Sequence, residues 1–123
     1  SLAFNQRFPT GAPTTPCGQG PEVAAIRGQA IHWYSATGSS VFTNALDFTD
    51  WILVLLDKAY MGGLDNDGLV DRCATHWGKV IKDNYAWNHV DEINHVLGLV
   101  GPFAPSPVAF FIQHANRLKL RGL

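Results

Sequence analysis

Residues 88–95 read Asn-His-Val-Asp-Glu-Ile-Asn-His (NHVDEINH), and the rest of the chain is organised around them. His89 lies within three positions of two carboxylates, Asp91 and Glu92. Histidine exchanges a proton near neutral pH, so His89 is a candidate for proton transfer. Asp91 can hold a hard cation through its carboxylate oxygens and so fix the loop that carries His89. The segment therefore predicts a functional site.

The composition narrows the class of protein. The chain has 123 residues, of which 46% are hydrophobic and 15% charged, with a net charge of -1. This is typical of one soluble domain or a large part of one, and the balanced charge argues against nucleic-acid binding. No apolar run approaches the roughly 20 residues that a membrane-spanning helix needs, so an integral membrane protein is not expected. No signal peptide is visible, and we expect the chain to begin at a processed end or partway through a larger protein.

The pattern of the remaining residues predicts short strands that alternate with helices. In chain order we expect a loop over residues 8–21, a hairpin of 23–26 and 29–35, a turn at 36–40, a helix over about 50–60, a turn at 64–68, one helical turn at 69–73 and a strand over 76–83. Thr49 or Asp50 can cap the first of these helices, and Gly62-Gly63 can end it.

The last segment gives the clearest helix. Ser106 is a capping residue, Pro107 suits the first helical position, and Gly122 ends the segment. Strands that alternate with helices indicate the α/β class. Because the strands are few and the chain starts without one, we expect residues 1–123 to be part of a single α/β domain, incomplete on its own.

Asp67 lies in the turn Asn66-Asp67-Gly68 and has two interpretations. An aspartate in such a turn commonly caps its own backbone. Alternatively, its carboxylate accepts a hydrogen bond from His89, fixes the tautomer of the ring and stabilises the imidazolium during proton transfer. The order acid then histidine is that of α/β-hydrolases, in which a serine comes earlier. The serines of this chain are Ser1, Ser35, Ser39, Ser40 and Ser106, and none lies in a G-x-S-x-G motif. We therefore expect the nucleophile to be absent and the chain alone to be inactive.

Asp47 and Asp91 are a second candidate pair. They are far apart in sequence, so no local calcium-binding motif is present. Asp47 can simply precede a helix, and Asp91 can be an exposed loop acid. A calcium ion shared by the two would instead clamp the histidine loop to the entrance of the helix.

Other polar residues have less specific interpretations. Cys17 and Cys73 are the only cysteines and form either one disulfide or two buried thiols. Structural roles are expected for three histidines: His32, His76 and His114. The Glu92 side chain can reach back toward the His89 region or be solvated, and the solvated interpretation is favoured.

Several segments resemble the secreted bacterial triacylglycerol lipases of the Pseudomonas and Burkholderia type. The resemblance is close at NHVDEINHVLGL (88–99) and SPVAFFIQHANRLKLRGL (106–123). Earlier family segments are matched, in order, by NDGLVDRC (66–73), TNALDFTD (43–50) and FNQRFPTGAPTTPCGQG (4–20). The resemblance covers nearly the whole chain, but only the later two fifths or so of such a lipase. It implies the C-terminal portion of an α/β-hydrolase fold, a mostly parallel sheet with flanking helices, without the nucleophile-bearing N-terminal part.

The resemblance also implies roles for individual residues. Asp67 stands at the position of the triad acid and His89 at that of the general base. A structural Ca²⁺ site would use the carboxylates of Asp47 and Asp91 with the backbone carbonyls of His95 and Leu99. Cys17 and Cys73 would form the single disulfide. The family usually has glutamine in place of His95, which leaves a carbonyl ligand intact.

The function implied by the resemblance is hydrolysis of acylglycerols at a lipid–water interface by a secreted Ser-His-Asp enzyme. Its partners would be the N-terminal part of the same lipase and, for many such enzymes, a dedicated foldase met on export through the periplasm. Two alternatives are a short-chain carboxylesterase on the same scaffold and a calcium-stabilised fragment without activity.

Overall fold

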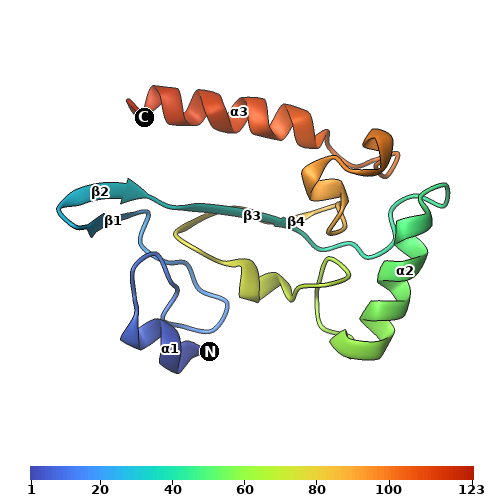
Figure 1. Ribbon diagram of the computed structural model, residues 1–123, viewed down its shortest axis with the longest axis horizontal. Helices are drawn as coiled ribbons and strands as arrows, with labels where there is room; N and C mark the ends of the chain where they lie inside the picture. Colours follow the sequence, from blue (N-terminus) through green and yellow to red (C-terminus); the bar gives the residue numbers. More distant parts are fainter.

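The computed structural model describes all of residues 1–123 and has a pair of parallel strands at its centre (Figure 1). Strands β3 (Tyr34–Gly38) and β4 (Lys79–Tyr85) pair with Tyr34 opposite Lys79. Helix α3 (Pro107–Leu120) runs along one side of this sheet, and the short helix η2 (Arg72–Thr75) lies on the other. Helices and two small sheets make this an α/β arrangement, and none of the helices is long and apolar enough to cross a membrane.

Aromatic side chains join α3 to the central sheet. Trp87 is 2% exposed, stacks on Tyr85 with ring centroids 4.1 Å apart and meets Phe110 of α3 edge-on at 5.7 Å. The indole Nε1 of Trp87 donates a hydrogen bond to the Pro105 carbonyl at 2.6 Å, so the ring is buried without leaving a polar atom unpaired. These contacts fix the end of β4, and residues 88–95 follow directly from it.

The hairpin is confirmed, but it is shorter than predicted. Strands β1 (Val23–Ile26) and β2 (Gln29–His32) are antiparallel, and Arg27 and Gly28 both have positive φ, as a two-residue type I′ turn requires. The second strand ends at His32, and residues 36–38, expected to be a turn, belong to β3. That prediction was wrong because β3 is formed by pairing with β4, more than 40 positions away, which local turn chemistry does not reveal.

Helix α2 (Phe48–Leu56) begins earlier than predicted. Its cap is Asp47, whose side chain accepts from the Thr49 backbone N–H, rather than Thr49 or Asp50. The helix continues as the π-helical segment η1 (Asp57–Met61) and ends at Gly62 in the left-handed conformation, as expected.

The remaining elements show smaller differences. The helical turn lies at η2 rather than at residues 69–73, and β4 starts three residues later than the predicted strand. Helix α1 (Leu2–Arg7) was not predicted. Helix α3 has the predicted start, since Ser106 accepts from the Ala109 N–H. The segments Asp91–Ile93 (η3) and Val96–Gly98 (η4) are single turns of 3₁₀ helix between β4 and α3.

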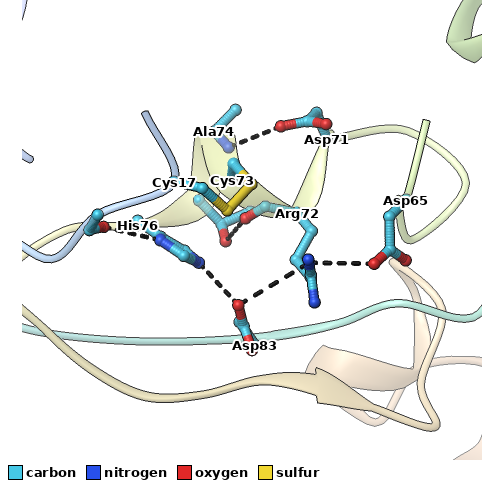
Figure 2. Close-up of a disulfide and its surroundings, with 10 residues drawn as sticks. Cys17, Asp65, Asp71, Arg72, Cys73, Ala74, His76 and Asp83 are labelled. Atoms are coloured by element: carbon cyan, nitrogen blue, oxygen red, sulfur yellow. Dashed lines mark hydrogen bonds and ion pairs between the residues drawn. A yellow bond between two sulfur atoms is a disulfide. The ribbon is translucent and has the colours of Figure 1, made fainter. Parts of the chain in front are cut away.

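Cys17 and Cys73 form a disulfide, as the resemblance implied (Figure 2). Next to it, His76 is nearly buried, with Nδ1 at 2.8 Å from the Gly18 carbonyl and Nε2 at 3.0 Å from Asp83 Oδ2. The Arg72 guanidinium Nε lies 3.1 Å from Asp65 Oδ2. We call the disulfide with His76, Asp83, Arg72 and Asp65 the disulfide corner. His76 has the structural place expected of it.

Candidate active site

Asp67 is held in place by the turn that carries it. Its Oδ1 accepts from the backbone N–H groups of Leu69 and Val70 at 3.0 and 2.8 Å, so the turn-capping interpretation is correct. Its other oxygen, Oδ2, lies 2.8 Å from His89 Nδ1, so the histidine-pairing interpretation is also correct in geometry. The two oxygens of one carboxylate serve the two purposes at the same time.

The Asp67–His89 pair is buried on one side and open on the other. The Asp67 side chain is 1% exposed, whereas the His89 side chain is 41% exposed. The backbone N–H of His89 also donates to the Asp67 carbonyl at 2.9 Å, which ties the two turns together. His89 Nε2 has no hydrogen-bond partner in the chain. An imidazole held through Nδ1 by a buried carboxylate, with Nε2 free, is arranged to exchange a proton with a reacting group.

Helix α2 supports the turn of Asp67. Gly68 has a φ of +102° and lies so close to the helix that a Cβ built there would be 2.8 Å from the Leu53 Cβ. Leu53 is 3% exposed. Any side chain at position 68 would therefore push the acid turn off the helix.

Glu92 is not solvated, contrary to the prediction. Its Oε1 accepts from the Thr37 hydroxyl at 2.8 Å and from the Gly38 N–H at 2.6 Å, at the end of β3. Burial raises the pKa of Glu92, and the Asp67 carboxylate adds to the rise, while the two hydrogen bonds oppose it. Possible ligand atoms of Asp67, His89 and Glu92 lie within 4.8 Å of one another. The solvated interpretation failed because it considered only neighbours in sequence, and Thr37 is 55 positions away.

Asp47 and Asp91 are both buried, with exposures of 0% and 1%. Asp47 Oδ1 accepts from the Thr49 N–H and hydroxyl, and Asp91 Oδ2 accepts from the Asn88 N–H and the Thr43 hydroxyl. The second oxygen of each, Asp47 Oδ2 and Asp91 Oδ1, is buried without a hydrogen-bond partner. Burial raises the pKa of Asp91, and the nearby carboxylates of Asp50 and Asp47 raise it further.

Two unpaired buried carboxylate oxygens fit a hard cation. Burying a charged oxygen without a partner is costly, and no lysine or arginine pairs with either aspartate. Calcium is bound by carboxylate and carbonyl oxygens and would remove this cost. The donor set at Asp47 and Asp91 is therefore suitable for Ca²⁺.

His95 and Leu99 lie on the strained loop that follows Asp91. The His95 carbonyl accepts from the Gly98 N–H at 3.0 Å, and the His95 side chain is exposed. Val96 and Leu97 have φ values of 48° and 59°, in the left-handed region that a β-branched residue such as Val96 rarely adopts. Carbonyl ligands at His95 and Leu99 stay a prediction.

Asp50 and Asn88 were missed at the sequence level. Both are completely buried, and the Asn88 side-chain amide donates to Asp50 Oδ1. Asp50 was predicted only as a possible helix cap, and Asn88 only as a neighbour of the histidine. Only a long-range contact, 38 positions apart, reveals their connection.

The other histidines and the serines do not enter this site. His114 packs against Tyr34 and Phe110, and burial followed by the Arg117 charge lowers its pKa. His32 lies in β2. No serine hydroxyl of this chain forms a hydrogen bond with His89, whose side chain bonds only to Asp67.

Comparison with known proteins finds several relatives that are named triacylglycerol lipases. The chain is 46% identical to a triacylglycerol lipase of Vibrio cholerae over 123 residues, which is 100% of this chain and 38% of that protein. It is 34% identical to a triacylglycerol lipase of Pseudomonas fragi over 98% of the chain and 42% of the relative. A 58-residue part is 55% identical to the triacylglycerol lipase of Burkholderia plantarii, covering 47% of this chain and 16% of the relative. No protein-family profile matches the chain. The chain thus spans about two fifths of the two relatives that it matches over nearly its whole length.

Proposed function

The chain is homologous to bacterial triacylglycerol lipases, and from this relationship we propose that it supplies the acid and the base of a Ser-His-Asp ester hydrolase. It would form the C-terminal portion of an α/β-hydrolase domain. The observation that carries the proposal is the 2.8 Å contact between His89 Nδ1 and Asp67 Oδ2, with the acid buried and the far side of the imidazole open.

Each residue of the pair has one role in the proposed reaction. Nε2 of His89 takes the proton of a serine hydroxyl as that oxygen attacks the ester carbonyl, and then gives it to the leaving alkoxide. Asp67 remains a carboxylate, orients the imidazole and stabilises its protonated form. The serine and the N–H groups that hold the oxyanion come from outside residues 1–123, in keeping with the fraction of each relative that the chain spans.

The proposed calcium site has a structural task only. Asp47 and Asp91, with the His95 and Leu99 carbonyls, would hold the ion. The ion supplies the positive charge that two buried carboxylates need, and so joins the turn of residues 88–95, called the histidine turn below, to the start of α2.

The proposed environment follows from the disulfide and the relatives. A disulfide persists in an oxidising compartment, which supports export through the periplasm. Acylglycerols at a lipid–water interface would be the substrate, and a foldase would be a further partner. The substrate class and the foldase are both implied by the resemblance to the lipase family.

An active-site-directed fluorophosphonate tests the proposal on the complete protein. The reagent should label one serine on a peptide outside residues 1–123, and His89→Ala should abolish the labelling while leaving the fold unchanged. Labelling of a serine in this chain, or equal labelling of the variant, would refute it. A panel of esters from short to long acyl chains, with and without chelator, then separates a lipase from a short-chain carboxylesterase. A preparation that neither reacts nor hydrolyses any ester would correspond to the inert calcium-stabilised fragment.

A further inference from the structure

We propose that Asp50 and Asn88 form a positioning pair for His89, acting without a metal ion, and that helix α2 is the common support of both members of the Asp67–His89 pair. The inference rests on the proposed function and concerns residues to which it assigns no role. The feature that suggests it is the inward face of α2. The helix has only two buried residues, Asp50 and Leu53, three positions apart and hence on one face.

The two buried residues of α2 support different turns. Leu53 packs against Gly68, next to Asp67, so that the helix carries the acid. Asp50 Oδ1 accepts from the side-chain amide of Asn88, so that the helix also carries the histidine turn. A shift of α2 would move both turns together and preserve the distance between Asp67 and His89.

Asn88 organises the backbone on both sides of His89. It is 0% exposed, and its side-chain oxygen accepts from the N–H groups of Val90 and Asp91 at 3.0 and 2.9 Å. Its own N–H donates to Asp91 Oδ2 at 3.1 Å. The turn is therefore wrapped around the Asn88 side chain, which Asp50 in turn fixes through the amide nitrogen.

Asp50 is satisfied entirely by neutral donors. Its Oδ2 accepts from the N–H groups of Thr43 and Asn44, and its Oδ1 accepts from the Asn88 amide. It has no unpaired oxygen, unlike Asp47 and Asp91. Three neighbouring buried aspartates thus divide into two suited to a cation and one that needs none. The Asp50–Asn88 bond should accordingly hold His89 whether or not calcium is bound.

Isosteric exchange of the two side chains tests this pair in the complete enzyme. Asp50→Asn turns an amide nitrogen toward the Asn88 amide nitrogen, and Asn88→Asp turns one carboxylate oxygen toward another. Each single variant loses the bond without a change of volume. The double exchange, Asp50→Asn with Asn88→Asp, allows the amide at position 50 to donate to the carboxylate at 88. The remaining acceptor oxygens can still serve Thr43, Asn44, Val90 and Asp91.

We expect each single variant to lower kcat at least tenfold with KM within twofold, because a displaced imidazole disturbs the reaction geometry more than substrate binding. The double exchange should restore kcat to within about threefold of wild type. Saturating calcium should not rescue the single variants. Asp83→Asn, an isosteric change of the same kind in the disulfide corner, is the matched control and should leave kcat unchanged.

A second measurement keeps the inference separate from the proposed function. The Nδ1 proton shared by His89 and Asp67 gives a downfield proton resonance that reports their alignment without any turnover. It should broaden or vanish in the single variants and return in the double exchange. Single variants with wild-type kcat and an unchanged resonance, or a double exchange no better than its parents, would overturn the positioning pair. If the protein does not hydrolyse esters, the resonance should still vanish in the single variants and return in the double exchange. Should a single variant fail to fold, Asn88→Ser makes the same comparison, since it removes the amide but keeps an acceptor oxygen.

Discussion

The disulfide corner and the histidine turn are fixed by different physical means. In the disulfide corner a covalent bond is accompanied by ion pairs of partly exposed side chains, with Arg72 30% and Asp65 54% exposed. Around the histidine turn four aspartates, Asp47, Asp50, Asp67 and Asp91, are buried almost completely, and none of them pairs with a lysine or arginine. The first region is stabilised largely by restriction of the unfolded chain, and the second by a fit that exists only in the native state. Changes in the first should alter stability, and changes in the second should alter activity and the response to metal.

The largest effect is expected at His89. His89→Ala in the complete enzyme should lower kcat by about 10³-fold or more, because no other group in the chain can replace the proton shuttle. The melting temperature should change little, since the His89 side chain is 41% exposed. Ester hydrolysis and thermal unfolding of the same preparation measure the two quantities. Turnover within a few-fold of wild type would remove His89 from the mechanism.

Removal of the disulfide should have the opposite profile. The bond links residues 56 positions apart, and the chain-entropy account gives about 4 kcal/mol for a loop of that size. Cys17→Ser with Cys73→Ser should lower the free energy of unfolding by about this amount, while the folded fraction keeps its kcat. Denaturant titration gives the first quantity and active-site titration the second. A large fall in kcat per folded molecule would show that the two regions are not independent.

The predicted calcium site should make the stability of the protein depend on calcium. Asp47→Ala or Asp91→Ala should remove the stabilisation that calcium provides, which amounts to about 3 kcal/mol when the ion is at a hundred times its dissociation constant. Chelator should lower the melting temperature of wild type toward that of the variants and leave the variants unchanged. Identical, calcium-insensitive melting curves for all three proteins would dispose of the site. A chelator effect that survives in both variants would place the ion elsewhere.

Loss of one carboxylate of the disulfide corner should be a smaller disturbance. Asp83→Asn removes the carboxylate that faces His76 Nε2 at 3.0 Å and should cost about 1 kcal/mol of stability. Ester hydrolysis at saturating substrate should be unaffected. The same variant serves as the control for the Asp50–Asn88 exchange, so a fall in its kcat would weaken both conclusions.

The sequence could predict the elements that are fixed by local contacts, and it could not predict those that depend on contacts between distant segments. Helix α3 and the β1–β2 hairpin were predictable because Ser106, Pro107 and Arg27-Gly28 act within their own segments. The strand at residues 36–38 was missed because its partner is β4. In the site, the family resemblance indicated Asp67 and His89, which the structure brings into contact, but their catalytic roles remain a prediction.

Buried polar groups were the other source of error. Glu92 was taken as solvated and Asp50 as a possible helix cap, and both are paired with residues distant in sequence. A carboxylate next to a helix start or a loop has the same local pattern whether it points to water or inward. Its partners decide the direction, and they are fixed only when the chain is folded.

The smallest effect is expected at a third region, where Glu22 contacts the carboxyl end of α3. Glu22 accepts from the Tyr34 hydroxyl at 2.9 Å and pairs with Lys79 and Arg121. The Tyr34 hydrogen bond lowers the pKa of Glu22, and the two cations lower it further against the opposing effect of burial. An acid whose pKa is lowered by folding stabilises the native state above its unfolded pKa and loses that contribution as the pH falls through its folded pKa.

The melting temperatures of wild type and Glu22→Gln should therefore differ by a constant amount above the unfolded pKa of a glutamate, roughly 4.3, and converge as the pH falls through the lower pKa of folded Glu22. Thermal unfolding between pH 3 and 7 measures the gap. The gap should also shrink at high salt, because the groups involved are partly exposed and their attraction is screened. A gap that persists at pH 3 would mean that Glu22 contributes through packing alone. The carboxyl end of α3 would then be stabilised by packing, like the histidine turn, and not by exposed charges, as in the disulfide corner.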